Sequence, residues 1–223
     1  MKKTIPTLLK LLLLCGFILL SAACSDDEED YTYPSVLTEL VEATTNAEKN
    51  IAFIKRDGGE TLYPGNQKIT ASAADSTYRC ICTYEMLKDE KGKATQNVKL
   101  YKLQSIFSKF PVPHDQLKTH DHHPIQVIST WKSERYFNMY FGLLTTGAES
   151  HYMAFSQDST VVSALGNKIM HVSLIHQQPK NDPESYTHKT YLSLPLYTMK
   201  DEADSLIFHV NTYNGEKQYE MNL

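Results

Sequence analysis

The stretch Tyr78-Arg79-Cys80-Ile81-Cys82-Thr83-Tyr84-Glu85 alternates with a period of two residues. One set of alternate positions carries Tyr, Cys, Cys and Tyr, and the other carries Arg, Ile, Thr and Glu. This pattern is typical of a half-buried β-strand, because successive side chains of a strand point to opposite faces of the sheet. We therefore predict that residues 78–85 form a strand whose tyrosines and cysteines face a core.

The same period recurs further along the chain, in residues 136–143, 168–176, 192–196 and 206–210. Turn residues such as Asp57-Gly58-Gly59 and Lys91-Gly92-Lys93 separate the alternating segments, so the sequence indicates an all-β protein. The apolar positions that we expect in the core are Phe137, Met139, Phe141, Leu143, Met170, Val172, Leu174, Leu192, Leu194, Leu196, Leu206, Phe208 and Val210.

Two local features refine this prediction. Asn214-Gly215 separates two alternating segments, which predicts a β-hairpin with a type I′ turn. Short helical pieces are expected only around Val36–Ala43 and Val161–Leu165.

A polar, proline-containing segment divides the chain into two domains. Residues 111–123 break the period of two, as a linker between domains does. Residues 34–110 then suit a small OB-like β-barrel, and residues 124–223 suit an antiparallel β-sandwich-like domain.

The N-terminus has the features of an export signal. Lys2, Lys3 and Lys10 precede or flank the apolar run Leu11–Leu20, which is shorter than a membrane span. Small residues at positions 21–23 then lead to Cys24, as in bacterial lipoprotein precursors. We expect residues 1–23 to be removed and Cys24 to receive acyl chains such as palmitate. The alternative is a soluble periplasmic protein cleaved near Ala23, with an unmodified Cys24 thiol.

Residues 24–33 are expected to be a solvated tether, because Asp26–Asp30 contains five consecutive acidic residues that repel one another. A cysteine followed by Ser25 and an acidic run also resembles the surface-export signal of Bacteroidota lipoproteins. The expected location is thus the outer membrane, with the folded part facing the cell surface. The periplasmic face is the alternative.

Composition limits the partners and the redox chemistry. The 223 residues carry a formal net charge of −4 with a sequence pI near 6.1, which argues against nucleic acid as a partner. Only Cys80 and Cys82 remain after the first 24 residues, and we expect both to be buried thiols without a disulfide. A weak metal or redox pair is the alternative for these two residues.

The segment His120-Asp121-His122-His123 is the main candidate for chemistry, since imidazole and carboxylate groups are zinc ligands. Its metal-ligand candidates are His120, His122 and His123, with His114 nearby. The alternative is a set of solvated linker histidines, because neighbouring loop residues seldom converge on one ion. The sequence contains no Gly-x-Ser-x-Gly, phosphate-loop or His-Glu-x-x-His motif, so we expect no cofactor and no enzymatic activity.

The polar connection from His176 to Tyr186 is either a solvated hairpin or a binding loop on a β scaffold. Other histidines on or beside the predicted strands of the second domain are His151, His171, His188 and His209.

The lipoprotein start is followed, in order, by the motifs Tyr33–Glu42, Gly58–Pro64, Arg79–Tyr84, Pro124–Trp131 and His176–Leu196. Together these motifs resemble the NigD-like lipoproteins of Bacteroidota. The resemblance implies an N-terminal OB-like domain and a C-terminal β-sandwich. It also implies an association with a bacteriocin locus, and it supplies no catalytic residues.

Three functions are compatible with these observations. The leading hypothesis is a non-enzymatic, lipid-anchored envelope protein that binds an extracellular protein or glycan, with a bacteriocin-like protein as one candidate. The second is a metal-dependent enzyme or metal-binding protein that uses the cluster from His120 to His123. The third is a structural envelope or adhesion subunit.

Overall fold

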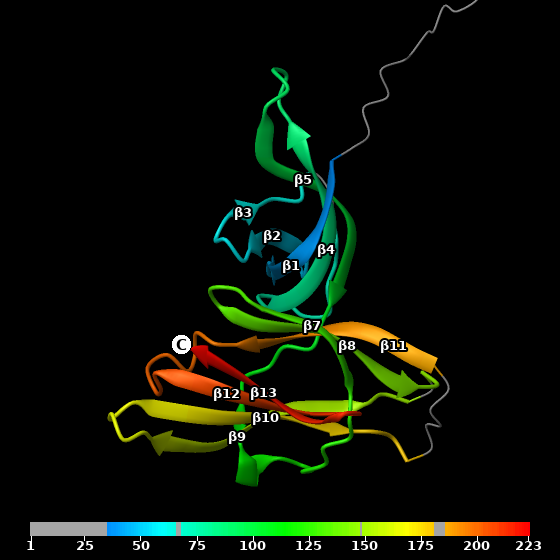
Figure 1. The fold of residues 1–223 in the computed structure, drawn as a ribbon. Helices are drawn as coiled ribbons and strands as arrows, with labels where there is room; N and C mark the ends of the chain where they lie inside the picture. Colours follow the sequence, from blue (N-terminus) through cyan, green and yellow to red (C-terminus); the bar gives the residue numbers. More distant parts are fainter. Residues whose placement is uncertain (1–34, 66–67, 148, 181–185) are drawn as a thin grey trace, which may run out of the picture. The chain divides into compact units, whose positions relative to one another are not determined.

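The computed structural model describes residues 35–65, 68–147, 149–180 and 186–223. Strands β1–β13 and one short 3-10 turn, η1 (His114–Gln116), make up the regular structure of this part, which confirms the all-β prediction (Figure 1). No helix within these ranges is long and apolar enough to span a membrane. The predicted signal, the tether and Cys24 lie outside the described residues.

The N-terminal domain is a five-stranded sheet in the order β3-β2-β1-β4-β5. A bridge between Tyr63, directly after β3, and Asn97 of β5 joins the two ends of this order into a barrel-like closure. The strands are β1 (Val36–Thr45), β2 (Ile51–Arg56), β3 (Thr61–Leu62), β4 (Thr77–Lys88) and β5 (Ala94–Ser105).

The core of this domain contains the predicted buried side of residues 78–85. Cys80, Cys82 and Tyr84 are buried against Val41 and Ile54. Neither cysteine forms a disulfide, as expected. Burial raises the pKa of the Cys82 thiol to about 12, so this thiol stays protonated and inert at neutral pH.

The two expected helical pieces are wrong. Residues Val36–Ala43 lie in β1, which pairs antiparallel with β4 from Val36 to Thr44 and with β2 from Val41. Val161 and Val162 end a strand, and the chain then turns. Pairing on both sides of β1 outweighs the weak helical period of this segment, which is rich in β-branched residues.

The C-terminal domain packs two sheets face to face. One has the order β13-β12-β10-β9-β6 and the other has the order β11-β8-β7. Most neighbours are antiparallel, but β10–β12 and β6–β9 are parallel. The strands are β6 (Val112–Pro113), β7 (Gln126–Lys132), β8 (Tyr136–Thr145), β9 (Tyr152–Val162), β10 (Lys168–Gln177), β11 (Tyr186–Pro195), β12 (Ser205–Thr212) and β13 (Gly215–Asn222).

All thirteen apolar residues predicted for the core belong to one buried cluster in this sandwich. Phe208 is at its centre, with its ring centroid 5.6 Å from that of Phe137 and 5.7 Å from that of Phe155. The period of two therefore identified the inner faces of β8, β10, β11 and β12 correctly.

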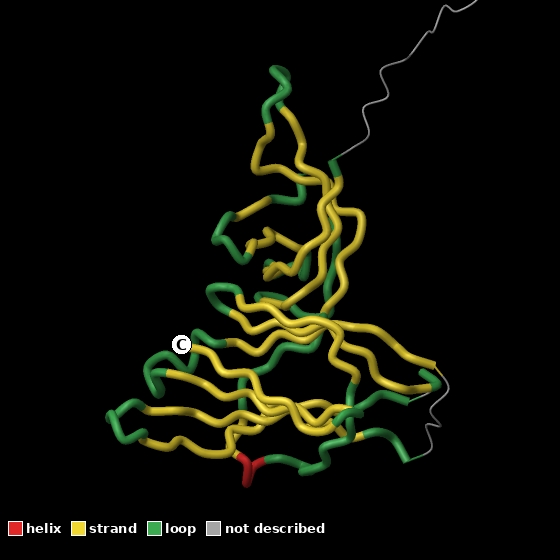
Figure 2. Tube along the Cα trace, in the orientation of Figure 1, coloured by secondary structure: helices red, strands yellow, loops and turns green. Residues whose placement is uncertain are grey.

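The segment 111–123, which we predicted as a linker, is attached to the C-terminal sheet. Val112–Pro113 forms β6, a parallel edge strand beside β9, and η1 follows directly, as the short red segment in Figure 2 shows. His122 then forms a bridge with His176 at the end of β10. The proline that suggested a linker is tolerated here because it lies on an edge strand.

The hairpin around Asn214 is confirmed, but its predicted turn type is wrong. Thr212 pairs with Gly215, and only Gly215 has a positive φ, +98°. A type I′ turn requires a positive φ at both central residues. The loop instead places glycine in the left-handed position after Asn214, as in hairpins with a G1 bulge.

Arg79 is a buried residue on the polar side of β4. Its guanidinium forms an ion pair with Asp57, with nitrogen to oxygen distances of 2.5 and 2.8 Å. It also donates to Ser193 Oγ (3.2 Å) and Asn138 Oδ1 (3.1 Å), and it stacks over the ring of Tyr136. The pattern of residues 78–85 placed this arginine on the face opposite the core, yet its side chain is only 1% exposed.

Candidate functional site

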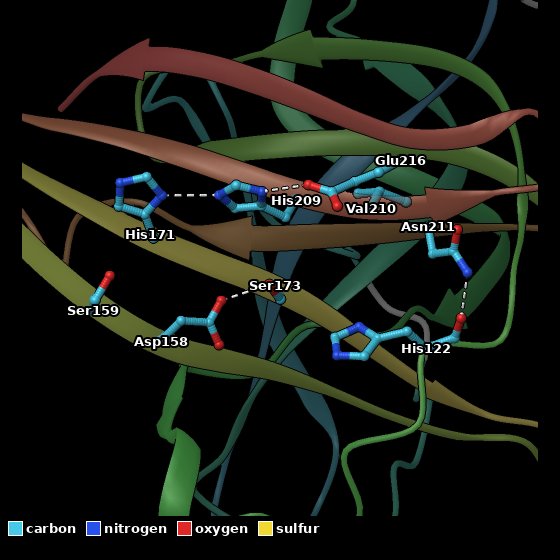
Figure 3. Close-up of a pocket in the computed structure, with 9 residues that line it drawn as sticks. All are labelled: His122, Asp158, Ser159, His171, Ser173, His209, Val210, Asn211 and Glu216. Atoms are coloured by element: carbon cyan, nitrogen blue, oxygen red, sulfur yellow. Dashed lines mark hydrogen bonds and ion pairs between the residues drawn. The ribbon is translucent and has the colours of Figure 1, made fainter.

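A polar pocket of about 530 Å³ opens on the outer face of the five-stranded sheet of the C-terminal domain, β13-β12-β10-β9-β6 (Figure 3). The strands β10 and β12 direct their apolar residues into the core, so the alternate polar residues face outward. The residues that line the pocket are His122, Asp158, Ser159, His171, Ser173, His209, Val210, Asn211 and Glu216.

A β-bulge positions Asp158 in this pocket. His171 pairs with Ser159 and Val172 pairs with Gln157, so Asp158 is an extra residue without a Cα partner on β10. A bulge can turn two consecutive side chains toward one face. Asp158 and Ser159 accordingly both line the pocket.

The Asp158 carboxylate is held by two serine hydroxyls. Ser156 Oγ donates to Oδ1 at 2.6 Å, and Ser173 Oγ donates to Oδ2 at 2.5 Å. Nδ1 of His114 lies 3.1 Å from Ser156 Oγ and 3.4 Å from Asp158 Oδ1. Because Ser156 is fully buried, this network fixes one wall of the pocket rigidly.

A relay of two imidazoles and one carboxylate forms the opposite wall. Nδ1 of His209 lies 2.9 Å from Glu216 Oε1, and Nε2 of His209 lies 2.9 Å from His171 Nδ1 (Figure 3). The hydrogen bond from His209 lowers the pKa of Glu216, with a further contribution from Gln218. Glu216 is therefore ionised at neutral pH and accepts a hydrogen bond from His209 Nδ1.

His122 occupies the edge of the pocket. Its Nδ1 lies 3.3 Å from the carbonyl oxygen of Leu174, and its own carbonyl accepts a hydrogen bond from Asn211 Nδ2 at 2.6 Å. These contacts attach the segment before β7 to β10 and β12. They place one predicted metal candidate beside residues that are distant in sequence.

The other two metal candidates point elsewhere. His120 stacks on His114 with ring centroids 4.2 Å apart, and His123 directs Nδ1 to the carbonyl of His176 at 3.2 Å. Throughout the part of the chain that the structure describes, no three His, Cys, Asp or Glu side chains are placed to hold a metal ion. The hypothesis of a metal site built from His120, His122 and His123 is therefore not supported by the geometry.

Two family models match consecutive parts of the chain. Residues 40–106 match the NigD-like N-terminal OB domain, and residues 108–223 match the NigD-like C-terminal beta sandwich domain. The chain belongs to the NigD-like family. All nine residues that line the polar pocket belong to the NigD-like C-terminal domain, and none of them comes from the OB domain.

Solved structures resemble this NigD-like chain along most of its length. A NigD-like immunity protein from Bacteroides caccae is 25% identical, with a TM-score of 0.61, and the match covers 86% of this chain and 94% of that one. A protein named as toxin related, from Parabacteroides distasonis, is 16% identical, with a TM-score of 0.62 and coverage of 84% and 93%. A protein named as a lipoprotein, from Bacteroides fragilis, is 10% identical, with a TM-score of 0.60 and coverage of 84% and 97%. No curated protein matches the chain.

Several site residues of the NigD-like domain escaped the sequence analysis. His171 and His209 were located on strands but not grouped, and Asp158, Ser173 and Glu216 were not singled out. A signal was present in the sequence: two polar residues lie two positions apart, and so on one face of a strand, at His171 and Ser173 of β10 and at His209 and Asn211 of β12. Their meeting depends on the parallel pairing of β10 with β12, which the period of two does not specify.

A second group of histidines surrounds His176, which is only 2% exposed. His176 Nδ1 donates to the carbonyl of His123 at 2.9 Å, so its Nε2 accepts from His151 Nδ1 at 2.8 Å. Burial lowers the pKa of His176 to about 4, with a smaller contribution from His151. This ring is therefore neutral in the folded NigD-like protein at neutral pH.

We expect this neutral histidine to make the fold acid-sensitive. The folded-state pKa lies below the ordinary value of 6.5, so the unfolded chain binds more protons between pH 6.5 and about 4. From pH 7 to pH 4.5, His176 should lower the free energy of unfolding by about 2 kcal/mol. Urea unfolding of wild type and of His176→Gln at both pH values measures this effect, because the variant lacks it. The exposed His188→Gln is the matched control, and an equal loss of stability in wild type and His176→Gln would exclude this role.

Proposed function

We propose that this NigD-like protein is a lipid-anchored, non-enzymatic protein of the cell envelope that binds a polypeptide partner through the pocket of its C-terminal domain. The observation that carries the proposal is the pocket itself. Asp158 and Glu216 are fixed by internal hydrogen bonds on an outward-facing surface of a rigid sheet. Fixed polar groups around an open hollow suit recognition, since little ordering is needed when a partner binds.

The N-terminal sequence supports the anchoring. The basic start, the apolar run and Cys24 match a lipoprotein precursor, and the acidic residues after Cys24 suit a solvated tether. A structural neighbour is named as a lipoprotein. We propose attachment to the outer membrane with the folded part at the cell surface, where an extracellular partner would be accessible.

The choice of a polypeptide partner draws on the structural neighbours. One is named as an immunity protein and another as toxin related. On the basis of these names we propose a bacteriocin-like polypeptide as the partner of this chain.

The chemistry of the pocket favours binding over catalysis. Ser156, whose hydroxyl donates to Asp158, is fully buried, so a substrate has no access to it. The relay through His209 ends at Glu216, whose side chain is 58% exposed. A catalytic relay gains most from a site that excludes water, and this one is solvated.

Site-directed crosslinking in living cells tests this proposal. A photoreactive amino acid at Ser159, inside the pocket, should give an adduct with a polypeptide when cells carrying the anchored protein meet its partner. The same amino acid at Lys91, in the exposed turn between β4 and β5, is the control and should give none. Protease treatment should digest the crosslinked partner, because the partner is a polypeptide. Equal labelling from both positions, or an adduct that resists protease, would refute a polypeptide partner at this pocket.

A further inference from the structure

The groups that line the pocket present hydrogen-bond acceptors to its interior. The relay shows how this arises. Ionised Glu216 can only accept, so the proton of neutral His209 lies on Nδ1 and its Nε2 accepts from His171 Nδ1. Neutral His171 therefore carries a lone pair on its own Nε2. The carboxylate thus sets the tautomer of an imidazole two hydrogen bonds away.

The same reasoning applies to the other wall and to the edge. Nδ1 of His122 faces a carbonyl oxygen, so the neutral ring has its lone pair on Nε2. The amide nitrogen of Asn211 donates to the His122 carbonyl, which leaves the amide oxygen as an acceptor. Oδ2 of Asp158 accepts the Ser173 hydroxyl and retains a second lone pair, while Oδ1 accepts the Ser156 hydroxyl and also faces His114 Nδ1.

The charge of the residues that line the pocket favours the same kind of ligand as their hydrogen-bond acceptors do. With the imidazoles neutral, the ionised residues among the nine that line the pocket are Asp158 and Glu216, and both are negative. A ligand that complements this pocket is a cation with several N–H donors. A neutral sugar offers hydroxyl donors without the charge.

We infer that the pocket binds an arginine side chain of the partner, an inference that rests on the proposed function of binding a polypeptide. A guanidinium offers five N–H donors in a plane and no acceptor. The acceptors of the pocket come from β9, β10, β12, β13 and the segment around His122, so they surround the hollow instead of converging on one point. A planar fork can contact such dispersed acceptors, whereas an ammonium group is a compact point charge with three donors.

A titration with blocked peptides tests this inference on the mature chain. The probes are N-acetyl-Gly-Arg-Gly-amide and the same peptide with citrulline or lysine in place of arginine. Citrulline keeps the size and removes the charge. We expect NMR shifts of the His171 and His209 ring nitrogens with the arginine peptide, and an affinity at least about tenfold lower for citrulline. Equal affinities for arginine and citrulline or lysine, or shifts confined to residues outside the pocket, would overturn the assignment.

Variants of the carboxylates complete the test. Glu216→Gln and Asp158→Asn should each weaken the arginine peptide about tenfold, because each loses a charged acceptor. Glu220→Gln removes an exposed carboxylate of the same strand outside the pocket and should bind as wild type does. Glu216 is exposed, so its substitution keeps the test valid if Asp158→Asn disturbs the bulge. Unchanged binding by Glu216→Gln would contradict the inference.

The outcome is separable from that of the proposed function. If Ser159 crosslinks to a polypeptide in cells but no arginine peptide binds, the arginine site is wrong and the binding function stands. If the arginine peptide binds but no partner is captured, the pocket chemistry stands and the envelope-binding function fails.

Discussion

Replacing Arg79 by alanine is expected to lower the free energy of unfolding by about 3–5 kcal/mol. The guanidinium is nearly fully buried, and it satisfies Asp57, Asn138 and Ser193 at once. Truncation leaves the Asp57 carboxylate without its cation and the buried Ser193 Oγ without the donor that the guanidinium supplies. Asn138 Oδ1 then keeps only the hydrogen bond from Ser193 Oγ. It also removes the stacking on Tyr136. Chemical denaturation of the mature chain measures the change.

Arg56→Ala is the matched control for this experiment. Arg56 also forms ion pairs, with Glu39 and Glu60, but its side chain is 33% exposed. Solvent screens such pairs, so the cost should be about 1 kcal/mol or less. If Arg79→Ala were no more destabilising than Arg56→Ala, the buried network would not hold β4 to β8 and β11 as described.

Replacing Cys24 by alanine should release the protein from the membrane completely. Acyl chains contribute about 0.8 kcal/mol per buried CH₂ group, so losing them removes the free energy that holds the protein at the membrane. We expect the variant in the soluble fraction after cell lysis, without incorporation of labelled palmitate. Fractionation and metabolic labelling measure this directly.

Cys15→Ala controls for the loss of a thiol near the N-terminus. Cys15 lies inside the apolar run and should be removed with the signal, so this variant should remain anchored and labelled. A Cys24→Ala protein that stayed in the membrane fraction would show that another segment supplies the attachment.

Much of the fold could be predicted from the period of two along the chain. Leu192, Leu194 and Leu196 are all buried, as are Cys80 and Cys82, because strand geometry ties alternate positions to one face. The sequence pattern gave a wrong prediction where pairing with other strands determines the secondary structure. The weak helical pattern of Val36–Ala43 gave way to pairing with strands on both sides.

Arg79 shows why burial on a polar face could not be predicted. Its partners Asn138 and Ser193 lie 59 and 114 residues further along the chain. The alternation of residues 78–85 identifies the face on which the arginine lies, but it contains no information about what packs against that face.

The pocket was even less accessible to prediction, because its geometry depends on pairing and on an irregularity. His171 meets His209 only because β10 and β12 are parallel neighbours, and Asp158 faces the pocket only because of the bulge. Residues 120–123 were predicted as metal-ligand candidates because three histidines lie close together in the sequence. Their backbone directs the three rings to three different places.

Binding of the partner at the pocket is tested by measuring how tightly the crosslinked polypeptide, once purified, binds two proteins. These are the mature chain and its double variant Asp158→Asn with Glu216→Gln. Calorimetry should show an affinity loss of about a hundredfold for the double variant, since each carboxylate contributes about tenfold. Glu220→Gln should bind with unchanged affinity. Equal binding by wild type and by the double variant, with both folded, would contradict the claim that this pocket is where the partner binds.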